Sequence, residues 1–236
     1  MPGARILVTR PEPSASRTAT LLRQRGFLPV VLPLSETLAR DVGFSSDLRV
    51  DHVAATSGNA LVHANPHLID LLKPFPLSAV GERTARIARE LGFREVSHAD
   101  HDAQSLAELL LKRTGPGMRI AYLCGTPRKP VVEKIMREYG RDLLALETYQ
   151  TRSLTPDALE VAASFDAEFA AALVYSPFSA RLLAQFLHEQ GGETHRTTLF
   201  VCLSPAIAEA LPQSLRKVVT EFPSEESLIR TLEATL

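Results

Sequence analysis

Short apolar runs alternate along the chain with segments in which apolar residues recur every three or four positions. The first example is an apolar run at residues 6–9, a segment with helical spacing at 14–25, and a second apolar run at 27–32. Helical spacing predicts an amphipathic helix, and continuous apolar runs are typical of strands buried on both faces. The chain is therefore predicted to open as β-α-β in a parallel sheet covered by helices.

A second alternating series follows a polar connector, residues 33–47, which lacks helical spacing and contains Pro33 and Gly43. Its strands are predicted near residues 50–55, 77–80, 95–97, 119–123 and 143–147. Its helices are predicted at residues 58–72, with a break at Pro66, and at 82–91, 102–113 and 128–139.

The stretch LLALETYQTRS, residues 143–153, ends this series and leads from an apolar strand into polar residues. A third series follows, with strands near 171–175, 199–202 and 217–220 and helices near 156–164, 177–190, 205–211 and after Ser224. The outer series together supply as many strands as the middle one. We therefore expect an α/β protein with a discontinuous first lobe, residues 1–36 and 152–236, and an inserted second lobe, residues 37–151. The stretch 143–153 would return the chain to the first lobe and set Tyr149 at the mouth of the cleft between them.

Composition narrows the class of partner. The 236 residues carry a net charge of -1, so the charge of the whole molecule gives no reason to expect nucleic acid or an anionic membrane surface. No run of about 18 apolar residues predicts a membrane span, and no signal peptide is visible.

Cys124 and Cys202 are too few for a disulfide framework, and each ends a predicted strand, which favours a core role. The expected location is the cytoplasm.

Polar or turn residues follow six of the predicted strands, at the edge where parallel sheets bind ligands. These junctions are Thr9-Arg10-Pro11, Thr56-Ser57-Gly58-Asn59, Gly81-Glu82-Arg83-Thr84, Gly125-Thr126-Pro127-Arg128-Lys129, Ser176-Pro177-Phe178-Ser179 and Ser204-Pro205. Ordinary N-capping would explain any one of them. Arg83, Arg128 and Lys129 are predicted in first helical turns, where the helix dipole disfavours cations unless they are solvated or an anionic ligand is bound.

Other patterns favour different chemistry. His98-Ala99-Asp100-His101-Asp102 has metal-ligand residues, but a polar loop that ends in an Asp N-cap is the favoured explanation. No dinucleotide or P-loop motif is present.

Tyr149 differs from the other tyrosines because it lies past a strand end among polar residues. There its phenol could donate a proton, or its ring could pack across a hinge.

Five stretches of the chain are informative together: ILVTRPEPSASRTATLLRQRGF, VAATSGNALVHA, AVGERTARIARELGF, LCGTPRKPVVEKIMREYG followed by ETYQT, and ALVYSPFSARLLAQF. In this order and spacing, which cover nearly the whole chain, they resemble the uroporphyrinogen-III synthase family of the tetrapyrrole pathway. The resemblance implies two flavodoxin-like lobes, each a parallel sheet of about five strands flanked by helices, joined by two extended connectors at residues 32–38 and 146–153. It also implies cyclisation of hydroxymethylbilane to uroporphyrinogen III, with the last ring inverted and with no metal or organic cofactor.

The resemblance also implies roles for individual residues. The family's tyrosine falls on Tyr149 and the threonine of its Gly-x-x-Thr-Ala motif on Thr84, while Thr56, Ser57, Ser176 and Arg128 match strand-end positions. Many relatives carry Gly-Pro-Thr-Thr at the last junction. Here Ser204-Pro205-Ala206-Ile207 lacks both threonine hydroxyls, so binding there would depend on Ser204 and backbone N–H groups.

These residues are expected to have two different roles. Tyr149 is the candidate catalytic donor to the leaving hydroxyl, and the candidate contacts for the substrate's carboxylates are Arg10, Thr56, Ser57, Thr84, Arg128, Ser176 and Ser204. The expected partners are the tetrapyrrole substrate and, transiently, the preceding enzyme of the pathway, for a protein that is monomeric by default. A non-catalytic two-lobe binding protein or sensor for an acidic small molecule is the alternative from another class.

Overall fold

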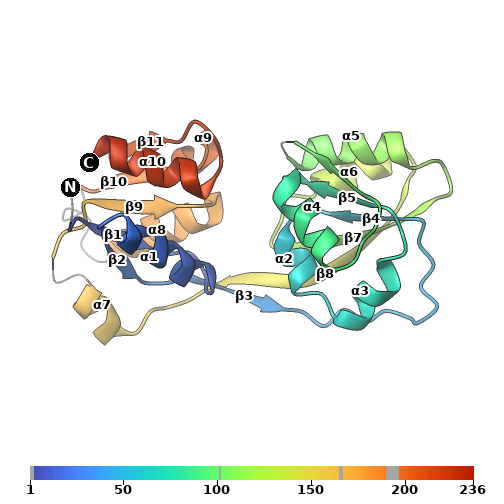
Figure 1. The fold of residues 1–236 in the computed structure, drawn as a ribbon, viewed down its shortest axis with the longest axis horizontal. Coiled ribbons are helices and arrows are strands. Elements are labelled where there is room, and N and C mark those ends of the chain that lie inside the picture. Colours follow the sequence, from blue (N-terminus) through green and yellow to red (C-terminus); the bar gives the residue numbers. More distant parts are fainter. Residues whose placement is uncertain (1–2, 101, 165–166, 190–196) are drawn as a thin grey trace. The chain divides into compact units, whose positions relative to one another are not determined.

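The computed structural model describes residues 3–100, 102–164, 167–189 and 197–236. The chain divides into two compact units, which are described one at a time: residues 1–37 with 152–236 form unit 1, and residues 38–151 form unit 2. Each unit contains one sheet of mostly parallel strands with helices on its faces (Figure 1). The α/β class predicted from the alternating pattern is therefore confirmed.

The sheet of unit 1 is parallel and has five strands in the order β11-β10-β9-β1-β2. In chain order this is 2-1-3-4-5, the flavodoxin-like arrangement. Its strands are β1 (Arg5–Val8), β2 (Leu28–Val31), β9 (Ala171–Val174), β10 (Leu199–Cys202) and β11 (Arg216–Val219). Its helices are α1 (Ser14–Gln24), α7 (Ala158–Ser164), α8 (Pro177–Glu189), α9 (Pro205–Glu209) and α10 (Glu225–Thr235).

Both faces of this sheet are buried, which explains why its strands read as continuous apolar runs. Ile6 and Val8 pack on one face with residues of α1 and α10, while Leu7 packs on the other face with residues of α8 and α9. The alternation along β1 follows from the two-residue period of a strand.

The sheet of unit 2 has the order β3-β8-β7-β4-β5-β6. The strands are β3 (Ser35–Ala39), β4 (His52–Ala55), β5 (Leu77–Val80), β6 (Val96–Ala99), β7 (Arg119–Thr126) and β8 (Asp142–Ser153). The helices are α2 (Gly58–Val62), α3 (Pro66–Leu72), α4 (Gly81–Glu90), α5 (Ala103–Arg113) and α6 (Val131–Glu138). Helices α2, α3 and α4 cover one face, and α5 and α6 cover the other.

Two segments carry the chain from one unit to the other, and they pair with each other. Arg40 N–H donates to Thr148 O at 2.9 Å, and Leu154 N–H donates to Leu34 O at 2.9 Å. The residue numbers of these pairs have the same sum, which identifies an antiparallel ladder between β3 and β8. Residues 33–47 were predicted as a connector without a strand, and the family resemblance implied an extended connector at 32–38. The extended connector is confirmed, and the strand that was not predicted, β3, forms because this polar segment pairs with β8.

Helix α6 also begins later than predicted. The predicted start was residue 128, but Pro130 is the N-cap and the helix begins at Val131. Pro127 and Pro130 lack the N–H and the conformational freedom to extend the helix backwards. Arg128 and Lys129 therefore precede the helix, and the dipole argument applies only to Arg83, which lies in the first turn of α4.

The two cysteines are buried and unpaired, as the core interpretation predicted. Burial raises the pKa of Cys124 to about 12 and that of Cys202 to about 11, so both stay protonated thiols at neutral pH. In the part of the chain that the structure describes, no helix combines the length and apolar character needed to cross a bilayer.

Candidate functional site

The carboxyl ends of β4, β5 and β7 lie along one edge of the parallel sheet in unit 2. Thr56 and Ser57 follow β4, Thr84 lies in the first turn of the helix after β5, and Arg128 follows β7. Helices α2 and α4 pack together at this edge, since a Cβ on Gly58 would lie 2.5 Å from Ile87 Cδ1. Four of the candidate residues thus belong to one edge of one sheet, where parallel α/β proteins bind ligands.

A β-bulge sets the position of Tyr149. Cys124 pairs with Glu147 and Gly125 with Tyr149, so Thr148 is an extra residue in β8. Thr148 is fully buried, and its Oγ1 donates to Ala60 O at 2.6 Å. The bulge therefore anchors β8 to α2 immediately before Tyr149.

The ring of Tyr149 lies against the backbone of Gly125. A Cβ at residue 125 would be 2.2 Å from Tyr149 Cζ, so a side chain cannot occupy this position unless the ring moves. The phenol donates to Ser57 Oγ at 3.2 Å, and Ser57 Oγ also accepts from Asn59 N–H at 3.0 Å as the N-cap of α2. Tyr149 and Ser57, which are distant in sequence, are thus brought into contact.

Thr56 and Thr84 differ in what surrounds them. Thr56 Oγ1 accepts a long hydrogen bond of 3.4 Å from Tyr122 O–H. Burial raises the pKa of Tyr122 to about 12, so this phenol stays a donor. Thr84 is buried in the first turn of α4, and in the described part of the chain its hydroxyl has no hydrogen bond.

Arg128 is already paired with two carboxylates. Its Nε donates to Glu133 Oε1 at 2.7 Å, and its Nη1 donates to Glu147 Oε1 at 2.7 Å and to Gly125 O at 3.0 Å. Burial alone would lower the pKa of Arg128, but the hydrogen bonds to Glu147 and Glu133 raise it, so the group stays charged. Glu147 also forms an ion pair with Arg40, so the positive charge at this corner is largely compensated.

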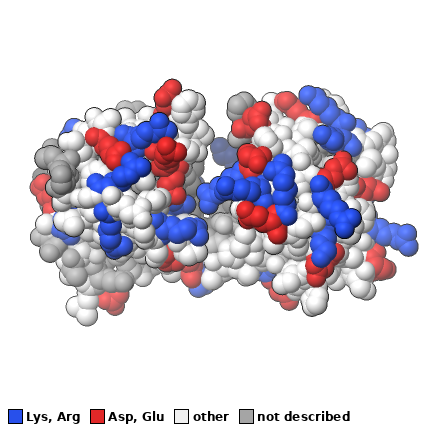
Figure 2. Space-filling view, in the orientation of Figure 1, with Lys and Arg blue, Asp and Glu red and all other residues white. Residues whose placement is uncertain are grey.

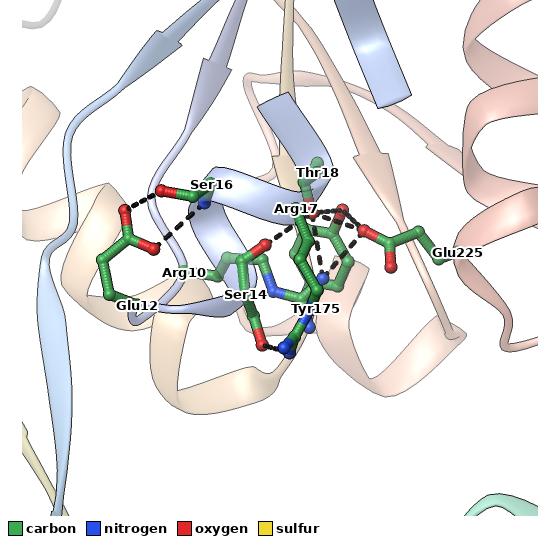
Figure 3. A network of polar contacts seen from close by, with 8 residues as sticks. All are labelled: Arg10, Glu12, Ser14, Ser16, Arg17, Thr18, Tyr175 and Glu225. Carbon is green, nitrogen blue, oxygen red and sulfur yellow. Dashed lines mark hydrogen bonds and ion pairs between the residues drawn. The ribbon is translucent and has the colours of Figure 1, made fainter. Parts of the chain in front are cut away.

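In unit 1, Arg10 belongs to a network of four side chains that lie in or next to β1, α1, β9 and α10 (Figure 3). Arg10 Nη1 donates to Thr18 Oγ1 at 3.1 Å and to Glu225 Oε1 at 2.9 Å. Its guanidinium carbon lies 3.9 Å from the ring centroid of Tyr175, a cation–π contact. Tyr175 O–H donates to Glu225 Oε1 at 3.2 Å, and burial raises the pKa of Tyr175 to about 12.

The two candidate serines of unit 1 have different surroundings. Ser176 and Ser179 form a capping box at the start of α8: Ser179 N–H donates to Ser176 Oγ, and Ser176 N–H donates to Ser179 Oγ, both at 3.0 Å. Ser204 is the N-cap of α9, but its side chain makes no capping hydrogen bond. The Ser204 hydroxyl is therefore freer to contact a ligand than that of Ser176.

The metal interpretation of residues 98–102 finds no support in the described residues, which hold no group of His, Cys, Asp and Glu suited to a metal ion. His101 lies outside these residues. Asp102 caps α5 in a capping box with Ser105, and His98 Nε2 lies 3.1 Å from Glu82 Oε2. The N-cap explanation is confirmed for Asp102.

Charge is distributed in small groups. On the face drawn in Figure 2, basic and acidic side chains lie next to each other on both units and form no large region of one sign. On this face an acidic ligand would therefore be held by individually placed donors.

Sequence reasoning missed the acidic partners of the two arginines, Glu225, Glu133 and Glu147. Glu225 lies in the first turn of α10, where the helix dipole already explains an acidic residue. Gly125 was noted only as part of a turn, because its position opposite Tyr149 depends on the register of β7 with β8. The pairing of Arg10 with Glu225 joins residues too far apart in sequence for a local pattern to reveal, whereas Glu133 is five residues from Arg128.

The sequence pattern that defines the family "Uroporphyrinogen-III synthase HemD" matches residues 16–230. The uroporphyrinogen-III synthetase structure from Helicobacter pylori shares 17% identity over 100% of both chains, with a TM-score of 0.72. A mutant uroporphyrinogen III synthase from the extremely thermophilic bacterium Thermus thermophilus shares 18% identity over 98% of both chains, with a TM-score of 0.65. Among curated proteins none matches. The structural likeness supports the fold, and the sequence match shows that the chain belongs to the uroporphyrinogen-III synthase family.

Proposed function

We propose that this chain closes hydroxymethylbilane, a linear tetrapyrrole with acidic arms, into uroporphyrinogen III, with loss of water and inversion of the last pyrrole ring. Membership of the family makes the chain a uroporphyrinogen-III synthase, a cyclising lyase. The observation that carries the proposal is the match of the family pattern to residues 16–230. The contact between Tyr149 and Ser57 supplies a proton donor at the ligand-binding edge of a sheet.

In the proposed first step Tyr149 acts as a general acid. Its phenol gives a proton to the terminal hydroxyl of the substrate, the carbon–oxygen bond breaks and water departs. This leaves an electrophilic azafulvene, still protonated on its nitrogen, and the Tyr149 phenolate. In the free chain the phenol donates to Ser57 Oγ at 3.2 Å, and the substrate hydroxyl would replace Ser57 as the acceptor. Packing against Gly125 limits the positions that the ring can take.

The second task is to steer ring closure. The free bilane closes by itself to the symmetric isomer, so the enzyme must direct attack to the substituted ring carbon through a spiro intermediate. Direction of this kind depends on holding the substrate's arms in place. The side chains proposed to bind the carboxylates are Arg10, Thr56, Ser57, Thr84, Arg128, Ser176 and Ser204.

The direct test supplies freshly made hydroxymethylbilane to the purified protein, without added metal or cofactor, and separates the oxidised products by isomer. Isomer III should predominate. Formation of isomer I alone, at the spontaneous rate, would contradict the proposal and favour an acidic-ligand binding protein.

Spontaneous closure of the substrate also bears on partners and location. Direct transfer from the enzyme that makes the bilane would shorten its life in solution, so we include a transient contact with that enzyme, in the cytoplasm, in the proposal. A coupled assay tests the contact: an excess of inactive preceding enzyme should lower the yield of isomer III if the two active enzymes transfer substrate directly.

A further inference from the structure

Arg10 presents a free edge of its guanidinium. Both hydrogen bonds of this guanidinium leave from Nη1, to Thr18 Oγ1 and Glu225 Oε1. In the described residues no hydrogen bond uses Nε or Nη2 of Arg10. These two N–H groups lie on the same side of the planar guanidinium, and they match the two oxygens of a carboxylate.

Two neighbours fix the orientation of this edge. The ring of Tyr175 stacks on the guanidinium at 3.9 Å, and Glu225 binds Nη1 at 2.9 Å. Glu225 is itself held, because Tyr175 O–H donates to the same Oε1 at 3.2 Å and Thr18 Oγ1 lies within hydrogen-bond distance of it. The side chain of Arg10 is only 13% exposed, so it has little freedom to turn away.

We infer that Glu225 and Tyr175 are positioning residues that hold Arg10 with its Nε and Nη2 edge ready for one carboxylate arm of the substrate. The inference rests on the proposed function, which supplies an acidic substrate. A flexible arginine loses side-chain entropy when it binds, and orientation in advance removes part of that cost. Glu225 acts through Arg10 and does not itself touch the substrate.

Substitutions should separate orientation from simple stabilisation. Arg10→Lys removes the two-donor edge and should raise KM about tenfold, with a smaller change in kcat. Glu225→Ala should raise KM by a similar factor, whereas Glu225→Gln should restore most of the affinity because its amide oxygen can accept from the same donors. Tyr175→Leu should raise KM, and Tyr175→Phe should raise it less because the stacked ring remains.

The decisive comparison is the double variant Arg10→Lys/Glu225→Ala. If Glu225 acts only through Arg10, this variant should have the same KM as Arg10→Lys alone. Glu233→Ala is the matched control, since Glu233 lies on the same helix and pairs with Arg25 at 2.9 Å away from the Arg10 network. It should leave KM unchanged.

Several outcomes would overturn the inference. If folded Glu225→Ala has an unchanged KM, or if the effects of the two substitutions on KM add in the double variant, Glu225 is only a structural ion-pair partner. The proposed function would still stand in that case, because the wild type would still make isomer III. If Glu225→Ala does not fold, the KM values of Glu225→Gln and Tyr175→Leu are compared instead. A KM near the wild-type value in Glu225→Gln with a raised KM in Tyr175→Leu supports the inference, and an unchanged KM in Tyr175→Leu contradicts it.

If the wild type makes no isomer III, the proposed function fails, and a binding experiment tests the inference separately. The NMR signal of Arg10 Nε–H should shift when uroporphyrin III, a non-reacting carboxylated tetrapyrrole, is added to the full chain. Absence of a shift would show that this edge takes no carboxylate.

Discussion

Each unit places an arginine just after a parallel strand, beside a tyrosine ring and a carboxylate, but the two arginines differ in their free donors. Arg10 lies 3.9 Å from the Tyr175 ring and binds one carboxylate through Nη1. Arg128 lies 5.9 Å from the Tyr122 ring, and its Nε and Nη1 bind two carboxylates and a carbonyl. Arg10 can donate two parallel hydrogen bonds to a carboxylate from its Nε and Nη2, whereas Arg128 can offer the same edge only if Nε first releases Glu133. Position at a strand end therefore does not by itself make an arginine a ligand contact.

The largest expected effect separates Tyr149 in unit 2 from Tyr175 in unit 1. Tyr149→Phe should lower turnover by about 100-fold or more, with little change in KM, because the proposed proton donor is lost. Tyr175→Phe should retain most turnover, because its ring still stacks on Arg10. Steady-state rates of isomer III formation measure both. Unchanged turnover in Tyr149→Phe would remove Tyr149 from the acid role.

A second variant tests the close packing of Tyr149 on Gly125 in unit 2. Gly125→Ala would place a Cβ 2.2 Å from Tyr149 Cζ, and the ring would have to leave its position over the backbone. We expect a loss of about 1–3 kcal/mol in the free energy of unfolding, measured in urea, together with lower turnover. Gly43→Ala is the control, since a Cβ there meets nothing within 4 Å. Equal stability of the two variants would contradict the packing argument.

The different ion pairs of Arg10 and Arg128 should also give their variants different free energies of unfolding. Arg128→Met leaves Glu133, whose side chain is 15% exposed, without its partner, and should lower the free energy of unfolding by about 1–2 kcal/mol. Arg10→Met should cost less, because Glu225 keeps Thr18 and Tyr175 as hydrogen-bond partners. Urea unfolding of both variants makes the comparison. A greater loss of stability in Arg10→Met than in Arg128→Met would show that Arg10, and not Arg128, has the larger structural role.

Sequence alone was sufficient for the fold class because continuous apolar runs and helical spacing report burial directly. It failed at β3, where polar residues form a strand through pairing with β8, and at the start of α6, where two prolines delay the helix. It identified candidate residues by their position at strand ends. It could not reveal the ion pairs of Arg128, since the one with Glu147 depends on the pairing of β7 with β8 and the one with Glu133 depends on the late start of α6.

A change of pH should alter the stability that the ion pair between Arg128 and Glu147 contributes. The hydrogen bond from Arg128 lowers the folded-state pKa of Glu147 more than burial raises it, and Arg40 lowers it further. This contribution to stability is present above the unfolded carboxyl pKa of about 4.3 and is lost as the pH falls through the lower folded-state value. Glu147→Gln should therefore flatten the fall in stability below about pH 4.3. Glu90→Gln, which removes a more exposed pair at 3.9 Å, should leave the acid unfolding curve nearly unchanged.

The smallest expected effect compares two buried threonines next to these sites. Thr9, 1% exposed and directly before Arg10, has no hydrogen-bond partner for Oγ1 in the described part of the chain, whereas Thr148 Oγ1 donates to Ala60 O at 2.6 Å. Valine has nearly the same shape as threonine, so Thr9→Val should be neutral or add up to about 1 kcal/mol of stability, because it removes an unsatisfied hydroxyl. Thr148→Val should cost about 1 kcal/mol, because it leaves the Ala60 carbonyl without this donor. Urea unfolding curves should show Thr148→Val less stable than the wild type and Thr9→Val at least as stable, and a loss of stability in Thr9→Val would show that its hydroxyl has a partner, such as a bound water.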